Sequence, residues 1–328
     1  MTTPMISVVM PIYNVEAYVG EAVLSVLNQT FKDFELIGVD DGGSDRSMDI
    51  VREFDDPRIR LIHQANRGLA GARNSGIAHA RGEFVALLDS DDVWHRDKLM
   101  LHFIHLRANP HVGVSYAGSR LIDAKGEPLS VAMQPKIGEV SAREIICRNP
   151  VGNGSAPVLR RTDLDKAAFM HPTTVGRKCW FDEDFRQSED IEMWIRLAVK
   201  HDVTFAGIDG LLTDYRILAG ALSANVVKQY LSWTKMLRKL REYAPEFVAA
   251  HGDTARAYQL RYLARRAVQL GNAELAKDLL GKALNLEPAI LIEEPRKTTT
   301  TAVAILAARM LGRDRFSNLM RPYLKEAA

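Results

Sequence analysis

The first 116 residues alternate short apolar runs with amphipathic stretches, and this alternation limits the folds that the chain can adopt. Runs with the length and composition of buried strands cover residues 6–11, 34–39, 59–63, 83–88 and 112–116. The stretches between them carry apolar residues at helical spacing, as in the segment with Val19 and Val23. Strands that alternate with helices form a mostly parallel sheet covered on both faces. We therefore predict an α/β fold.

Parallel strands are joined by right-handed crossovers, so their carboxyl ends lie along one edge of the sheet. At that edge we expect the loops after the first, second and fourth strands, at residues 11–14, 40–45 and 89–92. Ligands of open α/β sheets bind in the crevice outside these strand ends. The chemistry of the three loops therefore indicates the kind of ligand.

The fourth run ends in three carboxylates within four positions, Asp89, Asp91 and Asp92. Carboxylates this close repel one another and raise each other's pKa, so a cation is expected beside them. Oxygen ligands without nearby Cys or His suit Mg²⁺ or Mn²⁺, and Mg²⁺ is commonly held by one or two carboxylates together with substrate phosphates. The pattern predicts a divalent-metal site for a diphosphate ligand. The alternative is an Asp-rich turn that caps the helix beginning near Asp97.

Other residues near this edge can bind a nucleotide. Tyr13 can stack on a base or ribose, and Asp41 can accept hydrogen bonds from a pyrimidine ring or from sugar hydroxyls. Arg73, on the helix after Gly68, can pair with a diphosphate through two N–H groups. No G-x-G-x-x-G follows the first strand and no Gly-Lys-Ser/Thr loop occurs in the sequence, which argues against a dinucleotide oxidoreductase and an NTPase. A nucleotide-diphosphate site is favoured.

With 328 residues the chain has room for about two domains. Its 47% hydrophobic and 26% charged residues are typical of a soluble globular protein, and its two cysteines give neither a disulfide framework nor a zinc pattern. Residues 1–5 lack the basic region of a signal peptide, and the apolar run at residues 302–308 is too short to cross a bilayer. We expect a cytoplasmic protein without a nucleic-acid partner.

The net charge of +2 conceals an asymmetry, because residues 226–328 hold 18 Lys/Arg and 10 Asp/Glu. Their pattern is helical, and residues 256–270 and 273–286 form a predicted hairpin whose second helix resembles the B helix of a tetratricopeptide repeat. The basic excess predicts contact with an anionic surface or acceptor, such as peripheral contact with the inner face of a membrane. An ordinary solvated helical face is the alternative.

Four motifs then occur in order along the chain. They are S-V-V-M-P-I-Y-N at residues 7–14, V-D-D-G at 39–42, N-R-G with A-R-N-S-G at 66–76, and L-D-S-D-D at 88–92. The series resembles the family 2 nucleotide-sugar glycosyltransferases of the GT-A fold, over residues 5–225. The resemblance implies that Asp89 and Asp91 form the D-x-D element that binds the metal and the ribose-diphosphate, with Asp92 as a substitute metal ligand. It also implies a nucleotide-sugar site formed by Pro11, Tyr13, Asn14, Asp40, Asp41, Arg73, Asp89 and Glu189.

Further along, W-F-D-E at residues 180–183 precedes an acidic pair, Glu189 and Asp190, that opens a helix as in the same family. The resemblance implies that Asp190 is the general base of an inverting transfer, while Glu189 orients a substrate or caps the helix. It implies Mn²⁺ or Mg²⁺ to stabilise the departing nucleoside diphosphate, and a transition state like an oxocarbenium ion. The alternative for the pair is the common enrichment of acids in a first helical turn.

The chain departs from the family pattern in three places. Gly43 stands where most relatives have Ser. Leu218 occupies a position often held by His in the segment that begins at Tyr215, which makes a weaker dependence on metal an open alternative. The Q-x-x-R-W signature of processive members is absent, and addition of a single sugar is therefore favoured.

The predicted function is an inverting, metal-dependent glycosyltransferase that moves one sugar from a nucleotide sugar, with a UDP-sugar favoured, to a hydroxyl of a surface or lipid-linked glycan. We expect residues 1–117 to bind the nucleotide sugar, 118–225 to form the acceptor-binding and catalytic half of the same domain, and 226–328 to form an all-helical extension. A sugar-phosphate nucleotidyltransferase is less favoured, because residues 11–14 offer no Gly-rich loop. The remaining alternative is a non-catalytic nucleotide-sugar-binding scaffold with a helical partner-binding tail.

Overall fold

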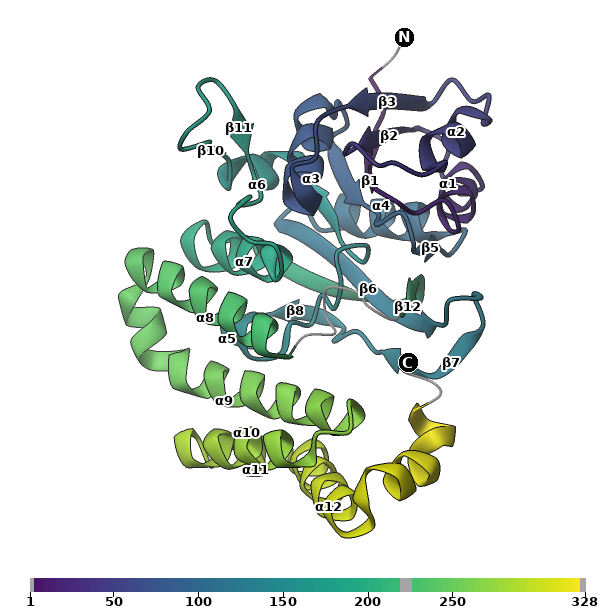
Figure 1. Cartoon of the computed structure of the whole chain (residues 1–328). Helices are drawn as coiled ribbons and strands as arrows, with labels where there is room; N and C mark the ends of the chain where they lie inside the picture. The colour runs from purple at the N-terminus through teal and green to yellow at the C-terminus, as the bar shows by residue number, and fades with distance from the viewer. Residues whose placement is uncertain (1–2, 219–225, 325–328) are drawn as a thin grey trace. The chain divides into compact units, whose positions relative to one another are not determined.

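The computed structural model describes residues 3–218 and 226–324, without the side chains of 313–315 and 317–324 (Figure 1). The chain divides into two compact units. The first, called the sheet unit below, consists of residues 1–142 and 150–216, and the second, the helical unit, consists of residues 143–149 and 217–328.

One large sheet organises the sheet unit, with the strand order β3-β2-β1-β4-β9-β6-β12-β5. The bounds of these strands are β1 (Ile6–Ile12), β2 (Phe34–Asp40), β3 (Ile59–His63), β4 (Phe84–Leu87), β5 (Val93–Trp94), β6 (Val112–Ile122), β9 (Val158–Arg160) and β12 (Thr204–Arg216). Two more strands extend the sheet, since β7 (Pro128–Met133) pairs with β6 and β8 (Gly138–Val140) pairs with β12. A separate hairpin consists of β10 (Phe169–Met170) and β11 (Lys178–Cys179).

The half of the sheet that contains β3, β2, β1 and β4 is parallel, as the alternation of strands and helices predicts. The short strand β9 runs antiparallel to both β4 and β6, whereas β6 and β12 are parallel to each other. The sheet is therefore mixed. The predicted α/β fold is confirmed, and the strand predicted at residues 112–116 continues to Ile122.

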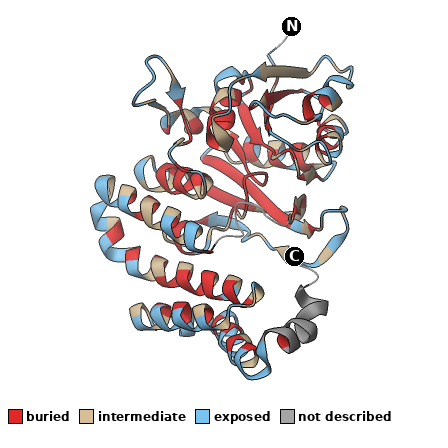
Figure 2. Ribbon diagram, in the orientation of Figure 1, coloured by how far each residue is buried: buried red, intermediate tan, exposed pale blue. Residues whose placement is uncertain are grey.

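The helices of the sheet unit are α1 (Val19–Leu27), α2 (Ser47–Arg52), α3 (Gly68–His79), α4 (Lys98–Ala108), α6 (Arg161–Lys166) and α7 (Glu189–Ile195), which continues into a π-helical turn at Arg196–Lys200. The apolar face of α1 packs into the core, where Val23 joins Val8 and Met10 of β1. Figure 2 shows the strands of the sheet as mostly buried. Burial of one such side chain contributes roughly 1.5–3 kcal/mol, so this core fixes the strands whose ends carry the predicted site.

The helical unit matches the prediction of a helical extension. Its described elements are α5 (Ala142–Arg148, of which Ala142 belongs to the sheet unit), α8 (Val226–Tyr243), α9 (Pro245–Gln269), α10 (Ala273–Leu286), α11 (Ile290–Glu293) and α12 (Pro295–Leu324). The predicted hairpin is present, with a longer first helix, and the side chain of Asn272 accepts a hydrogen bond from the backbone N–H of Leu275 at the start of α10. Gly312 has a left-handed φ of 73° and interrupts α12.

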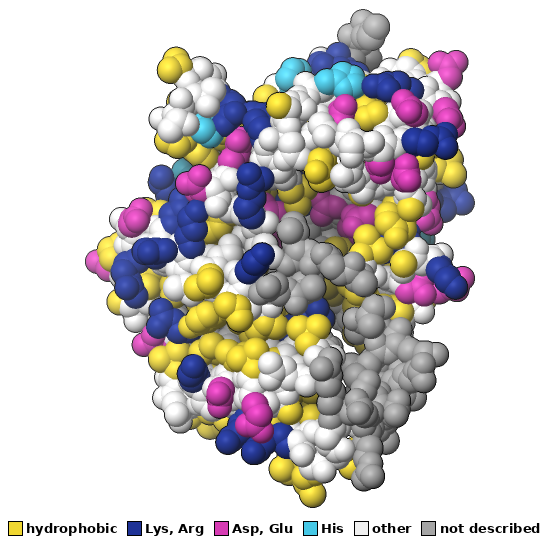
Figure 3. Space-filling model, in the orientation of Figure 1, with side chains coloured by type: hydrophobic (Ala, Val, Ile, Leu, Met, Phe, Trp, Pro, Cys, Tyr) yellow, Lys and Arg dark blue, Asp and Glu magenta, His cyan; other side chains and the backbone are white. Residues whose placement is uncertain are grey.

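Several large apolar side chains of the helical unit are exposed, including Val303, Leu306 and Met310 on α12. Hydrophobic side chains also gather on this unit in Figure 3. None of the helices within residues 3–218 and 226–324 combines the length and the apolar character needed to cross a membrane.

Candidate functional site

The loops after β1, β2 and β4 meet at the carboxyl edge of the sheet because their strands are parallel and in register. Pro11 lies opposite Val39, and the backbone N–H of Leu88 donates to the carbonyl of Val9 at 3.0 Å. Asn14 adopts a left-handed φ of 51°, which Asn tolerates better than most residues, and its side-chain oxygen accepts the N–H of Ser44 at 2.8 Å. The first two loops are thus tied together.

Tyr13, next to this link, keeps 49% of its surface exposed. Its ring is therefore available for stacking on a flat ligand, as the sequence predicts. Together with Asn14 and Asp40, Tyr13 lines a small hollow above the end of β1.

The loop after β2 begins with two Asp residues whose carboxylates have different surroundings. The side chain of Asp41 is 2% exposed and accepts three hydrogen bonds, from the Gln64 amide at 2.6 Å and from the backbone N–H groups of Arg67 and Gly68, both at 2.9 Å. Asp41 therefore holds the beginning of α3 in place. Asp40 is more accessible, and its carboxylate pairs with the His63 ring at 2.9 Å.

Arg73 of α3 is predicted to contact a diphosphate, and in the structure it lies between two acidic segments. Its guanidinium is 1% exposed and donates to Asp89 at 2.7 Å and to Glu189, the first residue of α7, at 2.9 Å. Burial opposes the charge of Arg73, but Asp89 and Glu189 outweigh it and raise the pKa of the guanidinium. One buried cation thereby connects residues that are 116 positions apart in the sequence.

Residues 89–92 after β4, called the acidic loop below, bring like charges into a poorly hydrated place. Burial, and then the neighbouring charge of Asp89, raise the pKa of Asp91 to about 6. Asp92 is fully buried; its oxygens accept the Ser155 hydroxyl at 2.6 Å and the backbone N–H of Arg216 at 2.9 Å. Burial and the charge of Asp91 raise the pKa of Asp92 well above its usual range. Asp92 thus faces the interior with both oxygens engaged.

Two residues at the end of β12, Tyr215 and Arg216, also lie beside the acidic loop. The sequence alone indicates no role for either of them. Arg216 donates to the backbone carbonyl of Asp91 at 2.8 Å and to the Glu21 carboxylate at 2.6 Å. Burial and the nearby charge of Asp92 raise the pKa of the Tyr215 hydroxyl. Their signal in the sequence is the Tyr-Arg pair that precedes Leu218. The rest of that segment, residues 219–225 with Ser223, lies outside the described residues.

The predicted general base lies at the beginning of α7. Asp190 is partly buried, and its carboxylate accepts the backbone N–H of Ile191 at 2.7 Å. Burial raises the pKa of Asp190 against the opposing effect of Arg73. For the adjacent Glu189, burial and the charge of Asp190 raise the pKa to about 7, again against Arg73. The two carboxylates and Arg73 therefore form one coupled group.

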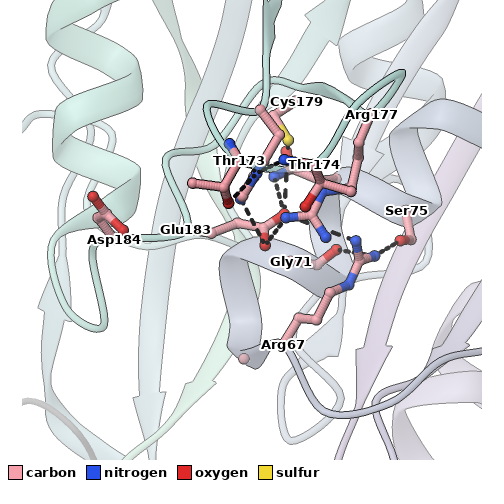
Figure 4. A network of polar contacts seen from close by, with 12 residues as sticks. Arg67, Gly71, Ser75, Thr173, Thr174, Arg177, Cys179, Glu183 and Asp184 are labelled. Carbon is pink, nitrogen blue, oxygen red and sulfur yellow. Dashed lines mark hydrogen bonds and ion pairs between the residues drawn. The ribbon is translucent and has the colours of Figure 1, made fainter.

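A second polar network anchors the hairpin of β10 and β11 to α3 (Figure 4). The Glu183 carboxylate accepts hydrogen bonds from Arg177 at 3.0 Å and from Asn74 at 3.1 Å, and the Cys179 thiol lies 3.7 Å away. Cys179 and Trp180 are buried, in keeping with the packing role that their residue types favour. This network positions the segment that leads to α7.

The acidic loop offers carboxylate oxygens but no complete set of metal ligands among the described residues. Within the described part of the chain, no cluster of three or more His, Cys, Asp or Glu side chains has the arrangement of a complete metal site. Asp89 and Asp91 offer hard oxygen donors, and the raised pKa of Asp91 shows that its negative charge is incompletely compensated. Two carboxylates that are completed by substrate phosphates are a normal way to hold Mg²⁺, so these residues fit a metal that arrives with a diphosphate.

Comparison with known proteins gives a consistent result. Residues 7–150 match the sequence model of "Glycosyl transferase family 2". An uncharacterized glycosyltransferase of Rickettsia felis is 32% identical over 216 residues, which are 66% of this chain and 33% of that protein. This chain thus spans about a third of the length of that relative. The Escherichia coli enzyme named UDP-Glc:alpha-D-GlcNAc-diphosphoundecaprenol beta-1,3-glucosyltransferase WfgD is 27% identical over 226 residues, 69% of this chain and 82% of that enzyme.

A solved structure supports the same fold. The mannosyltransferase PcManGT from Pyrobaculum calidifontis, in complex with GDP-Man and Mn²⁺, has a TM-score of 0.60 to this chain at 20% sequence identity. The match covers 100% of this chain and 86% of that one.

Proposed function

We propose that this chain transfers a single sugar, with inversion, from a nucleotide-diphosphate sugar to a hydroxyl acceptor, because residues 7–150 match the sequence model of glycosyl transferase family 2. The observation that carries the proposal is the position of Arg73. It joins the acidic loop, which suits a metal and a diphosphate, to the acidic pair at the start of α7, which suits proton abstraction. The residues proposed for the donor site and the residue proposed as the base therefore belong to one buried group of charged side chains.

On the donor side, Asp89 and Asp91 would hold Mn²⁺ or Mg²⁺, which would stabilise the negative charge of the departing nucleoside diphosphate. Tyr13 would stack on the base or ribose, and Asn14 and Asp40, which line the same hollow, would border that part of the site, with Pro11 of β1 two positions before Tyr13. Asp41 would act by holding the start of α3, since three donors already occupy its oxygens. A UDP-sugar is favoured, and the name of the Escherichia coli relative supports this choice.

On the acceptor side, Asp190 would take the proton of the attacking hydroxyl. The acceptor oxygen would form a bond to the anomeric carbon while the bond from that carbon to the phosphate oxygen breaks, and the leaving diphosphate would keep the electron pair. A raised pKa suits Asp190 for this role, because a base works best when its pKa lies near the working pH. Glu189, bound to Arg73, would orient this group. A lipid-linked glycan is the proposed acceptor, supported by the diphosphoundecaprenol in the relative's name.

The substitution Asp190→Asn tests the proposal. Removal of a general base lowers a rate by roughly 10²–10⁴-fold, so we expect such a loss of kcat while nucleotide binding is retained. Release of nucleoside diphosphate in the presence of acceptor measures the rate, and a thermal-shift panel of nucleotides with Mn²⁺ identifies the donor. The matched control is Asp209→Asn, the same chemical change at an exposed position of β12. Full activity of Asp190→Asn would contradict the assignment.

A non-catalytic nucleotide-sugar-binding protein is the alternative, and the same experiment separates the two. It predicts nucleotide-dependent stabilisation of the wild-type protein with no sugar transfer to any acceptor. In that case Asp190→Asn would change nothing measurable.

A further inference from the structure

A buried turn at residues 153–156 lies against the acidic loop, and its contacts centre on Ser155. The Ser155 hydroxyl accepts the backbone N–H of Asp89 at 2.9 Å and donates to the Asp92 carboxylate at 2.6 Å. One side chain thus bonds to both ends of the acidic loop. Ser155 has no exposed surface, so water does not replace these bonds.

The neighbouring Gly154 leaves the space that the Arg73–Asp89 ion pair fills. A Cβ atom at Gly154 would lie 2.1 Å from the nearest terminal nitrogen of Arg73 and 3.1 Å from a carboxylate oxygen of Asp89. Both distances are shorter than ordinary contacts. Arg73 is buried and bound to two carboxylates, so a Cβ atom at residue 154 would push its guanidinium away from the position in which it contacts Asp89 and Glu189. A side chain at residue 154 would therefore displace the Arg73–Asp89 ion pair from its present geometry.

Further contacts from several elements fix the turn itself. The Asn153 amide donates to Ser119 of β6 at 2.8 Å, and the Trp94 indole donates to the Ser155 carbonyl at 3.0 Å. The Lys98 ammonium, buried in α4, donates to the Ala156 carbonyl at 2.6 Å. Hydrogen bonds with β6, β5 and α4 thus hold this turn in place, and the turn thereby fixes the backbone of the acidic loop.

We infer that Gly154 and Ser155 are positioning residues, which set the separation and orientation of Asp89 and Asp91 for a divalent cation. This inference rests on the proposed function, because it concerns the proposed metal site. It assigns residues 153–156 to the donor side of the reaction, although they lie within residues 118–225, the expected acceptor-binding half. Groups that orient metal ligands typically change metal affinity by about 10–100-fold when they are removed.

The test is the affinity of the full-length protein for Mn²⁺, alone and with UDP, measured from the electron paramagnetic resonance of free Mn²⁺. We expect Gly154→Ala to raise the Kd for Mn²⁺ by about 10-fold or more. The matched control is Gly281→Ala in α10, where an added Cβ meets no atom within 4 Å. Ser155→Ala, which only removes atoms, carries the test if Gly154→Ala does not fold, and the same rise in Kd is expected.

Thermal unfolding in the absence of metal separates positioning from simple stability. A merely structural role would lower the melting temperature and leave the Mn²⁺ affinity of the folded protein unchanged, which would overturn the inference. If the wild-type protein binds no Mn²⁺ with or without UDP, the metal part of the proposed function fails together with the inference. Wild-type binding with unchanged affinity in both variants overturns the inference alone.

Discussion

The loop after β2 and the acidic loop after β4 start from the same elements, since each follows a parallel strand and each contains two adjacent Asp residues. In the loop after β2, three N–H donors from residues 64–68 bind the Asp41 carboxylate. In the acidic loop, Asp91 receives no side-chain hydrogen bond from the described residues and lies beside another carboxylate, which helps to raise its pKa to about 6. Hydrogen-bond donors compensate the charge of Asp41, whereas the charge of Asp91 is incompletely compensated.

The difference lies in the number of hydrogen-bond donors around each carboxylate, since both segments contain two adjacent Asp residues. A carboxylate with its lone pairs occupied by N–H groups stabilises the local backbone. A buried carboxylate without such donors costs free energy until a cation or a proton arrives. We therefore expect substitution of Asp41 to affect stability and substitution of Asp91 to affect the proposed metal binding.

Among the substitutions that compare the two loops, Asp91→Asn has the largest expected effect, a loss of transfer. Loss of a ligand should weaken Mn²⁺ binding by at least the roughly 10–100-fold typical of supporting residues, and the rate at limiting metal should fall in proportion. The melting temperature without metal should stay equal or rise, because the substitution removes an uncompensated buried charge. Transfer assayed over a Mn²⁺ series measures the first effect. Unchanged metal dependence would remove the distinction between the two loops.

Asp41→Ala should affect stability more than chemistry. Three partly buried donors lose their acceptor, and because an unsatisfied buried group costs about 1–3 kcal/mol, the urea midpoint should fall by an amount up to that size. The matched control is Asp40→Ala, which removes an exposed pair with His63 that is worth about 0–1 kcal/mol. Equal losses from the two substitutions would show that the donors around Asp41 contribute little.

The smallest effect is a pH dependence of metal stabilisation. The pKa of Asp91 is higher in the folded chain than in the unfolded one, so ionisation of Asp91 lowers the stability of the metal-free protein as the pH rises from about 4 to about 6. Mn²⁺ needs the ionised carboxylate, and its stabilisation should therefore grow over the same window. The melting-temperature shift from Mn²⁺ should be larger at about pH 7.5 than at about pH 5. Asp91→Asn should abolish this difference, and a pH-independent shift in the wild type would argue against Asp91 as a ligand.

The sequence predicts the parallel half of the sheet and the edge where its loops meet, because apolar runs and helical spacing are local signals. It also predicts the helical extension and the start of α7. The role of Arg73 is harder to predict, since its motif indicates a basic group near a diphosphate, whereas its partner Glu189 is 116 residues away. Only the folded structure shows that both terminal nitrogens of the Arg73 guanidinium already donate hydrogen bonds to carboxylates.

The turn at residues 153–156 shows why local sequence signals do not predict every part of the site. Asn153, Gly154 and Ser155, with Pro157 soon after them, are typical of a surface loop, and they lie within residues 118–225, the expected acceptor-binding half. In the structure Ser155 is fully buried because Trp94, Thr213 and the acidic loop all bond to it. Hydrogen bonds that satisfy a buried turn come from distant strands, so no window of neighbouring residues contains them.

The distance along the chain between the acidic loop and its partners also sets an order of assembly on the ribosome. Two hydrogen-bond partners of Asp92 are synthesised after it: Ser155 lies 63 residues later in the chain and Arg216 lies 124 residues later. At about 5–20 residues per second, the second partner emerges roughly 6–25 s after Asp92. Strands β1 to β4 can pair during that interval, while the acidic loop lacks the groups that bury Asp92. The parallel half of the sheet is thus complete in sequence before the residues that bury Asp92 are made.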